Sequence, residues 1–446
     1  MSNWSHYINK EIPCSCGKTH FCDIRHIAVE ENALSNLPAY LNEGAYQKIC
    51  LICDQNTEKV AGTYVEQILS EHGFTYKKIL FTDRELVADE RALHTIISEL
   101  PYDCNLILGI GSGTINDLCK FISFQKAMDY FIVATAPSMD GYASNVAVLT
   151  INQVKTTIET HRPKAILADT RILSAAPKRM IAAGVGDILG KYVCLADWKL
   201  SHLVTGEYFC DYIYGIMKQA VDAMTNSIDA ICIADENAIH IVMESLILAG
   251  VGMSFLGNSR PASGSEHHLS HYWEMMFLQR REYCPLHGTK VAIGTVICLF
   301  FYHSLPKYLE EADLHSDYVF DKGCWEKSIQ EAYELAADEI INLEARVEKN
   351  STKQVEKRKH NLSEYKNEIL KMAAELPSTD ILISYLKKLD APYLPKQIAV
   401  SANTLKNSIY YAKDLRNRYG ILQLLYDIGM QKKAVNDFTA FQEMIP

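Results

Sequence analysis

Four histidines and one aspartate in the middle of the chain are of the types that bind a divalent metal ion. His267 and His271 are four residues apart in a segment of helical pattern, so they would share one face. His268 would point about 100° away from that face. His287 opens a later helix, and Asp187 stands in a segment of small residues that lets another backbone or a ligand come close. One carboxylate and two imidazoles leave coordination positions open, as a catalytic metal site requires.

The start of the first histidine-bearing helix is also predicted from the residues. Ser263 and Glu266 have the spacing of a capping box, which marks a helix N-terminus. A single histidine is more often a hydrogen-bonded structural residue than a ligand. Because two small-residue motifs each present one ligand type, we favour a metal site over that alternative.

Three alternate glycines, Gly109, Gly111 and Gly113, join an apolar run to a helical pattern. They would present backbone N–H groups to a phosphate at the helix N-terminus. The loop is not the dinucleotide fingerprint, since the sixth position is Thr114, and it is not a P-loop, since Lys120 is out of register. The motif favours diphosphate binding over a plain tight turn, because the order strand, glycines, helix is present.

A second polar loop, Ala134–Ser144, leaves the carboxyl end of the next predicted strand. Ligands collect at that edge of open α/β sheets. The same Thr, Ser, Asp, Gly and Pro residues are equally typical of turns, so both interpretations stay open for this loop alone.

The elements that would position these motifs alternate between strand and helix in the first part of the chain, which predicts a parallel sheet. The predicted strands are Lys48–Cys53, Tyr76–Phe81, Asn105–Gly109, Tyr130–Ala134 and Ala165–Asp169, and the predicted helices are Glu58–His72, Arg84–Leu100 and Ile115–Phe124. From Pro177 onward the periodicity is helical. We therefore predict an α/β, Rossmann-like domain over residues 1–175 and an all-helical domain over residues 176–446.

Two segments of the helical part are predicted by composition. The longest apolar run, Val291–Tyr302, is too short to span a membrane and is expected to be a buried helix. The segment Glu344–Lys371 is rich in Lys, Glu and Asn, and is expected to be a solvated surface helix or helical hairpin.

The 446 residues carry a net charge of −10, which argues against nucleic acid or an anionic membrane as the main partner. Thirteen scattered cysteines and an N-terminus without a signal-peptide pattern indicate a reduced, cytoplasmic protein. Cys14, Cys16, His20 and Cys22 are spaced too tightly for the usual zinc arrangement, so a turn is favoured over a metal site.

These residues together resemble the sn-glycerol-1-phosphate dehydrogenase family, in its bacterial type, within the iron-containing alcohol dehydrogenase and dehydroquinate synthase-like superfamily. The resemblance rests on five stretches: Gly109–Asp117, Thr135–Ser144, Gly184–Lys191, Ser259–His271 and Leu286–Val291. It implies the reduction of dihydroxyacetone phosphate to sn-glycerol 1-phosphate with NAD(H) or NADP(H), for glycerophospholipid synthesis. It also implies one divalent ion, zinc or nickel, and a homodimer.

The resemblance assigns roles to individual residues. Asp187, His267 and His287 would hold the metal ion, and Asp140, Asp187 and His271 would contact the substrate, with Asp140 and His271 catalytic. The cofactor diphosphate would lie on Gly111, Ser112, Gly113, Thr114 and Ile115. Thr135, Ala136, Pro137, Ser138 and Ser144 would border the cofactor.

Asp54 matches the family's acid at the adenosine ribose. A carboxylate there accepts hydrogen bonds from the ribose and repels a 2′-phosphate, so we expect a preference for NADH. For the substrate phosphate, Arg260 and Lys290 are candidate cations, with ordinary ion pairing as the alternative for each.

Three other functions are compatible with these motifs. A glycerol or other polyol dehydrogenase of the same superfamily would act on dihydroxyacetone but not on its phosphate. A cyclising lyase of the dehydroquinate synthase type would bind NAD without consuming it. A non-catalytic nucleotide- or metal-binding protein would not need an open metal position.

Overall fold

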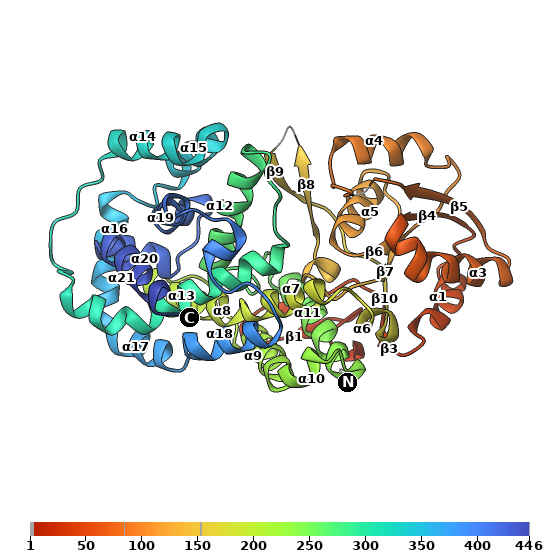
Figure 1. The fold of residues 1–446 in the computed structure, drawn as a ribbon, viewed down its shortest axis with the longest axis horizontal. Helices are drawn as coiled ribbons and strands as arrows, with labels where there is room; N and C mark the ends of the chain where they lie inside the picture. Colours follow the sequence, from red (N-terminus) through yellow and green to blue (C-terminus); the bar gives the residue numbers. More distant parts are fainter. Residues whose placement is uncertain (1–3, 84, 152–153, 446) are drawn as a thin grey trace. The chain divides into compact units, whose positions relative to one another are not determined.

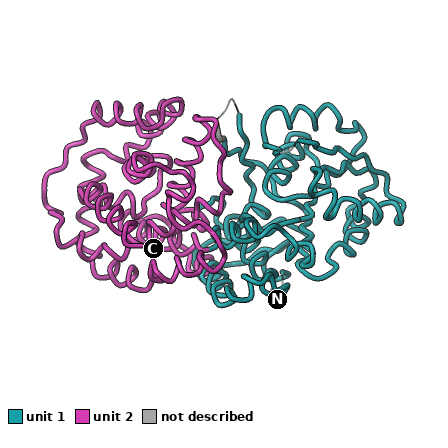
Figure 2. Tube along the Cα trace, in the orientation of Figure 1, with its two compact units in different colours: residues 1–188, 215–259 teal, residues 189–214, 260–446 magenta. Residues whose placement is uncertain are grey.

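The computed structural model of the protein describes residues 4–83, 85–151 and 154–445. The chain forms two compact units by its internal contacts (Figure 2). Unit 1 consists of residues 1–188 and 215–259, and unit 2 of residues 189–214 and 260–446. The strands end at Asp169, close to the predicted boundary at residue 175, whereas the compact units divide at other points.

A six-stranded parallel sheet forms the centre of unit 1, which confirms the predicted α/β fold (Figure 1). Its order is β3-β10-β7-β6-β4-β5. The three strands β6, β7 and β10 are buried along their whole length, which explains their continuous apolar runs. The strands are β3 (His26–Glu30), β4 (Lys48–Asp54), β5 (Thr75–Phe81), β6 (Leu106–Gly111), β7 (Tyr130–Ala134) and β10 (Ala165–Asp169).

Helices pack around this sheet. The helix α5 contacts β4, β6 and β7, α6 contacts β10, and α11 contacts β3. The helices of unit 1 are α1 (Leu37–Glu43), α3 (Thr63–Glu71), α4 (Glu90–Glu99), α5 (Gly113–Gln125), α6 (Thr170–Ser174), α7 (Lys178–Leu189), α9 (Asp211–Asn226), α10 (Ile228–Cys232) and α11 (Glu236–Leu256), with the first residues of α9 and the last of α7 assigned to unit 2.

The strand order contains a switch point. The chain passes from β4 outward to β5, then returns to place β6 on the other side of β4, and continues through β7 to β10. The loops that follow β4 and β6 therefore diverge, which opens a crevice at the carboxyl edge where ligands bind in such sheets. The strand order, which does not depend on the sequence motifs, therefore also indicates the glycine loop after β6 and Asp54 at the end of β4 as candidate ligand-binding groups.

Several boundaries differ from the sequence predictions. The strand β6 continues to Gly111, and α5 begins at Gly113 rather than at Ile115. The helix α4 begins at Glu90, because the Asp89 side chain accepts the Ala92 N–H and caps it there. Arg84, where this helix was predicted to begin, lies outside the described residues.

The predicted helix Glu58–His72 contains a π-helical turn at Glu58–Gly62 before α3, and the short α2 (Gln55–Thr57) precedes that turn. The edge strand β3 was not predicted. Two small antiparallel hairpins were also not predicted as strands: β1 (Ile12–Pro13) with β2 (Thr19–His20), and β8 (Val146–Ile151) with β9 (Val154–Glu159).

Unit 2 is helical throughout its described residues, as predicted for the C-terminal part. Its helices are α8 (Lys191–Thr205), α12 (Ser265–Gln279), α13 (His287–Glu311), α14 (Lys322–Tyr333), α15 (Ala337–Val347), α16 (Thr352–Glu364), α17 (Lys366–Ala374), α18 (Thr379–Lys388), α19 (Ala402–Tyr411), α20 (Ile421–Asp427) and α21 (Gln431–Met444). The apolar run Val291–Tyr302 lies in α13, as expected. The helices α11 and α13 are long and apolar enough to cross a membrane, but 89% and 78% of these segments are buried inside the protein.

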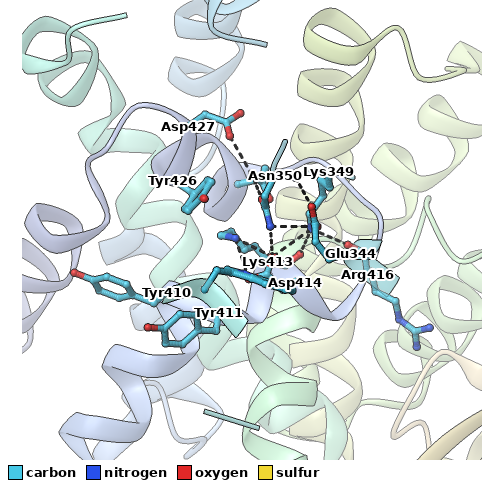
Figure 3. A network of polar contacts seen from close by, with 12 residues as sticks. Glu344, Lys349, Asn350, Tyr410, Tyr411, Lys413, Asp414, Arg416, Tyr426 and Asp427 are labelled. Carbon is cyan, nitrogen blue, oxygen red and sulfur yellow. Dashed lines mark hydrogen bonds and ion pairs between the residues drawn. The ribbon is translucent and has the colours of Figure 1, made fainter. Parts of the chain in front are cut away.

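The prediction of a solvated segment at Glu344–Lys371 is wrong for its central residues. Asn350 is fully buried; its N–H and Nδ2 donate to Glu344 at 2.7 and 3.2 Å, and Nδ2 also donates to Asp414 at 3.0 Å (Figure 3). Lys413 Nζ donates to both carboxylate oxygens of Asp414. Asp414 lies 64 positions from Asn350 in the chain, so local charge density gives no sign of this partner.

The same network fixes the segment that follows α19. The 3-10 turn η7 (Ala412–Leu415) packs against α12. The buried Lys349 donates to the carbonyl oxygens of Lys413 and Arg416 at 2.5 and 3.0 Å, and its pKa falls to about 8 because it is buried. Arg358 forms a bidentate ion pair with Asp427 and donates to the Lys349 carbonyl. The residues 412–420 are thereby held against the histidine-bearing helix.

One buried carboxylate joins four parts of unit 2. Asp197 of α8 accepts the N–H and Oγ–H of Ser265 on Oδ2, at 2.7 and 2.6 Å. Its Oδ1 accepts the Tyr302 hydroxyl at 2.5 Å and the Ile421 N–H at 2.8 Å. A Cβ atom on Gly420 would stand 2.2 Å from Asp197 Oδ2, so glycine is required there for a steric reason.

We expect Gly420→Ala to destabilise the protein by about 1–3 kcal/mol, because the added methyl group displaces a buried hydrogen-bonded carboxylate. Gly215→Ala is the matched control, since Gly215 lies inside α9 and an added Cβ would meet nothing within 4 Å. That control should be neutral or stabilising by up to about 1 kcal/mol. Thermal and urea unfolding of both variants would measure the difference, and equal stability of Gly420→Ala and the wild type would contradict the steric argument.

Candidate active site and metal centre

Three histidine rings converge in unit 2. The ring centroids of His267 and His287 are 5.1 Å apart, and His271 lies 6.2 Å from His267 and 5.8 Å from His287. Each of His267 and His287 offers a ligand nitrogen, and these atoms lie within 4.8 Å of each other. The first turn of α12 supplies His267, and the first residue of α13 is His287, as predicted.

A neighbouring carboxylate orients His267. Its Nδ1 lies 2.7 Å from Glu266 Oε1, which also accepts the Gly264 N–H. Because an ionised carboxylate only accepts, this contact places the proton on Nδ1, and Nε2 is the ring nitrogen that could bind a metal ion. A carboxylate behind the ring is the usual support of a metal-binding histidine. The sequence interpretation treated Glu266 only as part of a capping box and missed this role.

The predicted capping box itself is wrong. The residue that precedes α12 is Gly264, and no side chain of the capping residue bonds to the helix. The Ser265 N–H is bonded instead by Asp197, which comes from α8. A tertiary contact has replaced the local cap, and a sequence window around Ser263 cannot show it.

His271 is held from the same helix. Its Nδ1 lies 3.5 Å from Glu274 Oε2, one turn further along α12. Burial lowers the pKa of His271, the hydrogen bond and charge of Glu274 oppose that shift, and the charges of His267 and Arg416 add to it. The ring is therefore a neutral imidazole at neutral pH, which can accept or pass on a proton.

In unit 1, Asp187 lies near the end of α7 and is fully buried. Its Oδ2 accepts the N–H of Asp140 at 3.0 Å, so two of the predicted substrate residues are directly joined. Gly184, one turn earlier, allows this contact, because a Cβ there would stand 1.8 Å from Pro137 O. The prediction that the glycines near Asp187 allow a close approach is confirmed, and the approaching backbone is the second polar loop.

The glycine loop lies at the carboxyl end of β6. An added Cβ would meet Cys119 Sγ at 2.7 Å from Gly109, and Ile115 Cβ at 2.6 Å from Gly111. These two glycines therefore allow α5 to pack tightly on its strand. Gly113 has ordinary space around it, and Ser112, Gly113 and Thr114 at the start of α5 are half-buried.

A buried lysine holds the second polar loop. Lys120 Nζ donates to Gly141 O at 2.9 Å, to Ser144 Oγ at 3.0 Å and to Val146 O at 2.8 Å. Burial lowers its pKa to about 8. Ser144, predicted to border the cofactor, therefore has its hydroxyl engaged with Lys120, and the loop's shape is set from α5. Thr135, Ala136, Pro137 and Ser138 are all buried in the same loop.

Asp54 is the last residue of β4. Its Oδ1 accepts the N–H groups of Asn56 and Thr57 at 2.8 and 2.9 Å, so the side chain caps the following helical turn. Both bonds go to one oxygen, and Oδ2 has no bond to the described residues. The carboxylate is thus rigidly held at the switch point of the sheet.

The two cations considered for a substrate phosphate have other partners. Arg260 is buried; its Nε donates to Glu207, and its Nη2 to the carbonyl oxygens of Asp197 and Tyr419. Lys290 donates to Cys284 Sγ and Pro285 O, and so fixes the turn before α13.

Two arginines that the sequence interpretation missed lie in the segment after η7. Arg418 Nη1 donates to Ser263 O at 3.0 Å, just before α12. Burial and the charges of Arg260 and Arg416 lower the pKa of Arg418 to about 10, so three guanidinium groups are crowded here. No local motif marks this segment, because its position depends on contacts with α8 and α12.

The model of the iron-containing alcohol dehydrogenase family matches residues 28–177. Glycerol-1-phosphate dehydrogenase [NAD(P)+] of Geobacillus thermodenitrificans is 32% identical over 92% of this chain and 95% of its own. The protein of the same name from Bacillus licheniformis is 31% identical over 96% of both chains. The chain belongs to the glycerol-1-phosphate dehydrogenase family.

Solved structures agree with the fold of this glycerol-1-phosphate dehydrogenase family member. Glycerol dehydrogenase of Schizosaccharomyces pombe matches with a TM-score of 0.61 at 17% identity, over 95% of this chain and 93% of its own. An iron-containing alcohol dehydrogenase of Thermococcus thioreducens matches with a TM-score of 0.61 at 13% identity, over 93% of this chain and 99% of its own. Membership of the family makes the chain an oxidoreductase, and the resemblance inferred from the motifs is confirmed.

We expect Glu266→Gln to weaken divalent metal binding by about 10–100-fold, because the amide no longer fixes the His267 ring as a carboxylate does. His267→Ala should abolish binding at this centre. Glu339→Gln, on the exposed side of α15, is the control. Competition with a chromophoric chelator would measure the affinities, and an unchanged affinity in Glu266→Gln would exclude the orienting role.

Proposed function

We propose that the protein reduces dihydroxyacetone phosphate to sn-glycerol 1-phosphate, with NADH or NADPH as hydride donor, and that it acts in the cytoplasm to supply a glycerophospholipid precursor. The reaction consumes one proton and yields the oxidised nucleotide. The observation that carries the proposal is the His267–His271–His287 cluster with its supporting carboxylates, in a member of this family. The homodimer implied by the resemblance stays a prediction.

Asp187, His267 and His287 are the proposed ligands of one zinc or nickel ion. The backbone remains helical from α7 through Gly190 into α8, and Lys191 is about one turn beyond Asp187. Lys191 Nζ donates to Ala262 O at 2.9 Å, close before the histidine-bearing helix. Because Lys191 follows Asp187 by about one helical turn and is bonded just before α12, the path of the chain supports Asp187 as the third ligand. The bound ion supplies a Lewis acid for the substrate carbonyl oxygen.

The proposed cofactor site lies at the switch point of the sheet. The N–H groups at the start of α5, over Gly111, Ser112, Gly113, Thr114 and Ile115, suit a diphosphate. Asp54 Oδ2 is suited to accept a hydrogen bond from the ribose, and its charge disfavours a 2′-phosphate, which supports a preference for NADH. The loop from Thr135 to Ser144, held by Lys120, forms the other wall.

The proposed substrate contacts come from the second polar loop, from α12 and from the segment 412–420. Asp140, which is joined to Asp187 through its N–H, and His271, which is held by Glu274, are the candidates for hydroxyl binding and for proton transfer to the new alkoxide. Arg416 and Arg418 are the candidates for the phosphate, because an anion relieves the repulsion between crowded guanidinium groups.

The decisive measurement is consumption of NADH with dihydroxyacetone phosphate, with and without added zinc or nickel, followed by chiral analysis of the product. We expect metal-dependent, steady turnover and a lower rate with NADPH. Activity with dihydroxyacetone but none with its phosphate would favour a polyol dehydrogenase. Binding of NAD without net oxidation of NADH would favour a lyase, and retained activity after thorough metal removal would overturn the metal site.

We expect Arg416→Gln to raise the KM for dihydroxyacetone phosphate at least about tenfold, since a charged hydrogen bond to phosphate is worth about 1.5–3 kcal/mol. The KM for NADH should stay unchanged. Arg416 is exposed, so the substitution should not unfold the protein. The matched control is Arg346→Gln, at an exposed position of α15. An equal rise in both variants, or none in Arg416→Gln, would contradict the assignment.

A further inference from the structure

The N-terminal hairpin of unit 1 carries a cluster of thiols that the proposed reaction does not use. Its strands β1 and β2 pair over two residues each, with Ile12 opposite His20. In the turn between them, Cys14 N–H donates to Lys18 O and Gly17 N–H donates to Cys14 O. Gly17 has a φ of +83°, a left-handed conformation that favours glycine. The tight turn brings Cys14 and Cys16 to one end of the hairpin.

His20 completes this end of the hairpin. It is fully buried, its ring stacks on Phe255, and its Nδ1 lies 3.1 Å from the Phe255 carbonyl oxygen near the end of α11. Because a carbonyl only accepts, Nδ1 carries the proton and Nε2 presents its lone pair. That Nε2 lies 3.5 Å from Cys16 Sγ. A backbone carbonyl behind the ring is a common support of a metal-ligating histidine.

The geometry of these three residues fits a metal ion. The ligand atoms of Cys14, Cys16 and His20 lie within 4.8 Å of one another. In a tetrahedral zinc site with bonds of about 2.0–2.3 Å, neighbouring ligand atoms stand about 3.5 Å apart. Small movements of the side chains would therefore close the site. Thiolate and imidazole ligands favour zinc over harder divalent ions.

A fourth thiol directly precedes α9, a helix that lies in unit 1 from Gly215 onward. This residue, Cys210, is fully buried. The Tyr214 N–H donates to Cys210 O at 3.0 Å, so Cys210 is held in the first turn of that helix. Cys22 follows the hairpin and lies beside Ser254, but it does not belong to the group of ligand atoms that lie within 4.8 Å of one another.

We propose that Cys14, Cys16, His20 and Cys210 form a tetrahedral structural zinc site, in addition to the metal centre of the active site. Four protein ligands leave no open position, so the site is structural rather than catalytic. Two-residue strands cannot hold a hairpin by themselves. The zinc ion would fasten the N-terminal hairpin to the ends of α9 and α11. The sequence interpretation favoured a plain turn at these cysteines, and the proposal adds a zinc ion to that turn.

The test replaces the bound metal with Co²⁺ under reducing conditions and records the near-ultraviolet thiolate-to-cobalt charge-transfer band. An active-site ion bound by one carboxylate and two imidazoles gives no such band. We expect the band in the wild type and also in His267→Ala, which removes the active-site ion. A wild-type spectrum without the band overturns the structural site whatever the outcome of the enzyme assay.

Single cysteine-to-serine substitutions identify the ligands through their effect on the charge-transfer band. Cys14→Ser and Cys16→Ser should lose the band together with one zinc ion per chain, and Cys210→Ser should weaken it markedly. Cys324→Ser, at an exposed cysteine, is the matched control and should leave it unchanged. Loss in Cys22→Ser with no effect of Cys210→Ser would overturn the ligand set. If a variant fails to fold, the wild type can be titrated with a mercurial reagent in the presence of a dye that reports released zinc. Modification of the thiols without release of zinc would overturn the proposal.

Discussion

The buried carboxylate of Asp197 is the interaction on which the arrangement of unit 2 depends. Burial raises the pKa of this group and the charge of Arg260 opposes that rise, so removal from water is offset by a nearby cation and by four hydrogen bonds. Those bonds fix the start of α12 through Ser265, the position of α13 through Tyr302 and the start of α20 through Ile421. Gly264, Gly294 and Gly420 occur where backbones crowd this centre, since an added Cβ on any of them would stand less than 3 Å from a neighbouring atom. The positions of the histidines follow from this packing.

In unit 1, the buried cation Lys120 holds an irregular loop in place, as Asp197 holds the helices of unit 2. Lys120 is fully buried and donates to two carbonyl oxygens and one hydroxyl, so a loop with little regular structure has a fixed shape. The close contacts of Gly184 with Pro137 and of Gly250 with Ala143 hold the same loop from α7 and α11. The two glycines thus let α7 and α11 pack directly on the loop, and Lys120 supplies hydrogen-bond donors to its carbonyl oxygens.

The sequence was sufficient for the features that depend on local order. The strands Tyr130–Ala134 and Ala165–Asp169 were predicted to the residue, and the glycine loop and His287 stand at the starts of helices as expected. Features that depend on distant partners could not be predicted. Glu344 to Lys371 has the composition of a solvated segment, yet Lys349 and Arg358 are buried and meet partners from the last fifth of the chain. Arg416 has no motif around it, and the packing of η7 on α12 brings its charge close enough to affect His271.

The bond between Ile421 and Asp197 joins residues 224 positions apart. Since a ribosome makes the chain from its N-terminus, α8 and the histidine-bearing helices are synthesised long before the segment that completes their packing. Until residue 421 has emerged, Asp197 lacks one of its donors, and the arginines of the 412–420 segment are absent. The nascent chain can form the sheet of unit 1 early, but unit 2 stays incomplete until residue 421 has been made. The order of synthesis therefore makes the packing around the three histidines a late event, which follows the formation of the sheet.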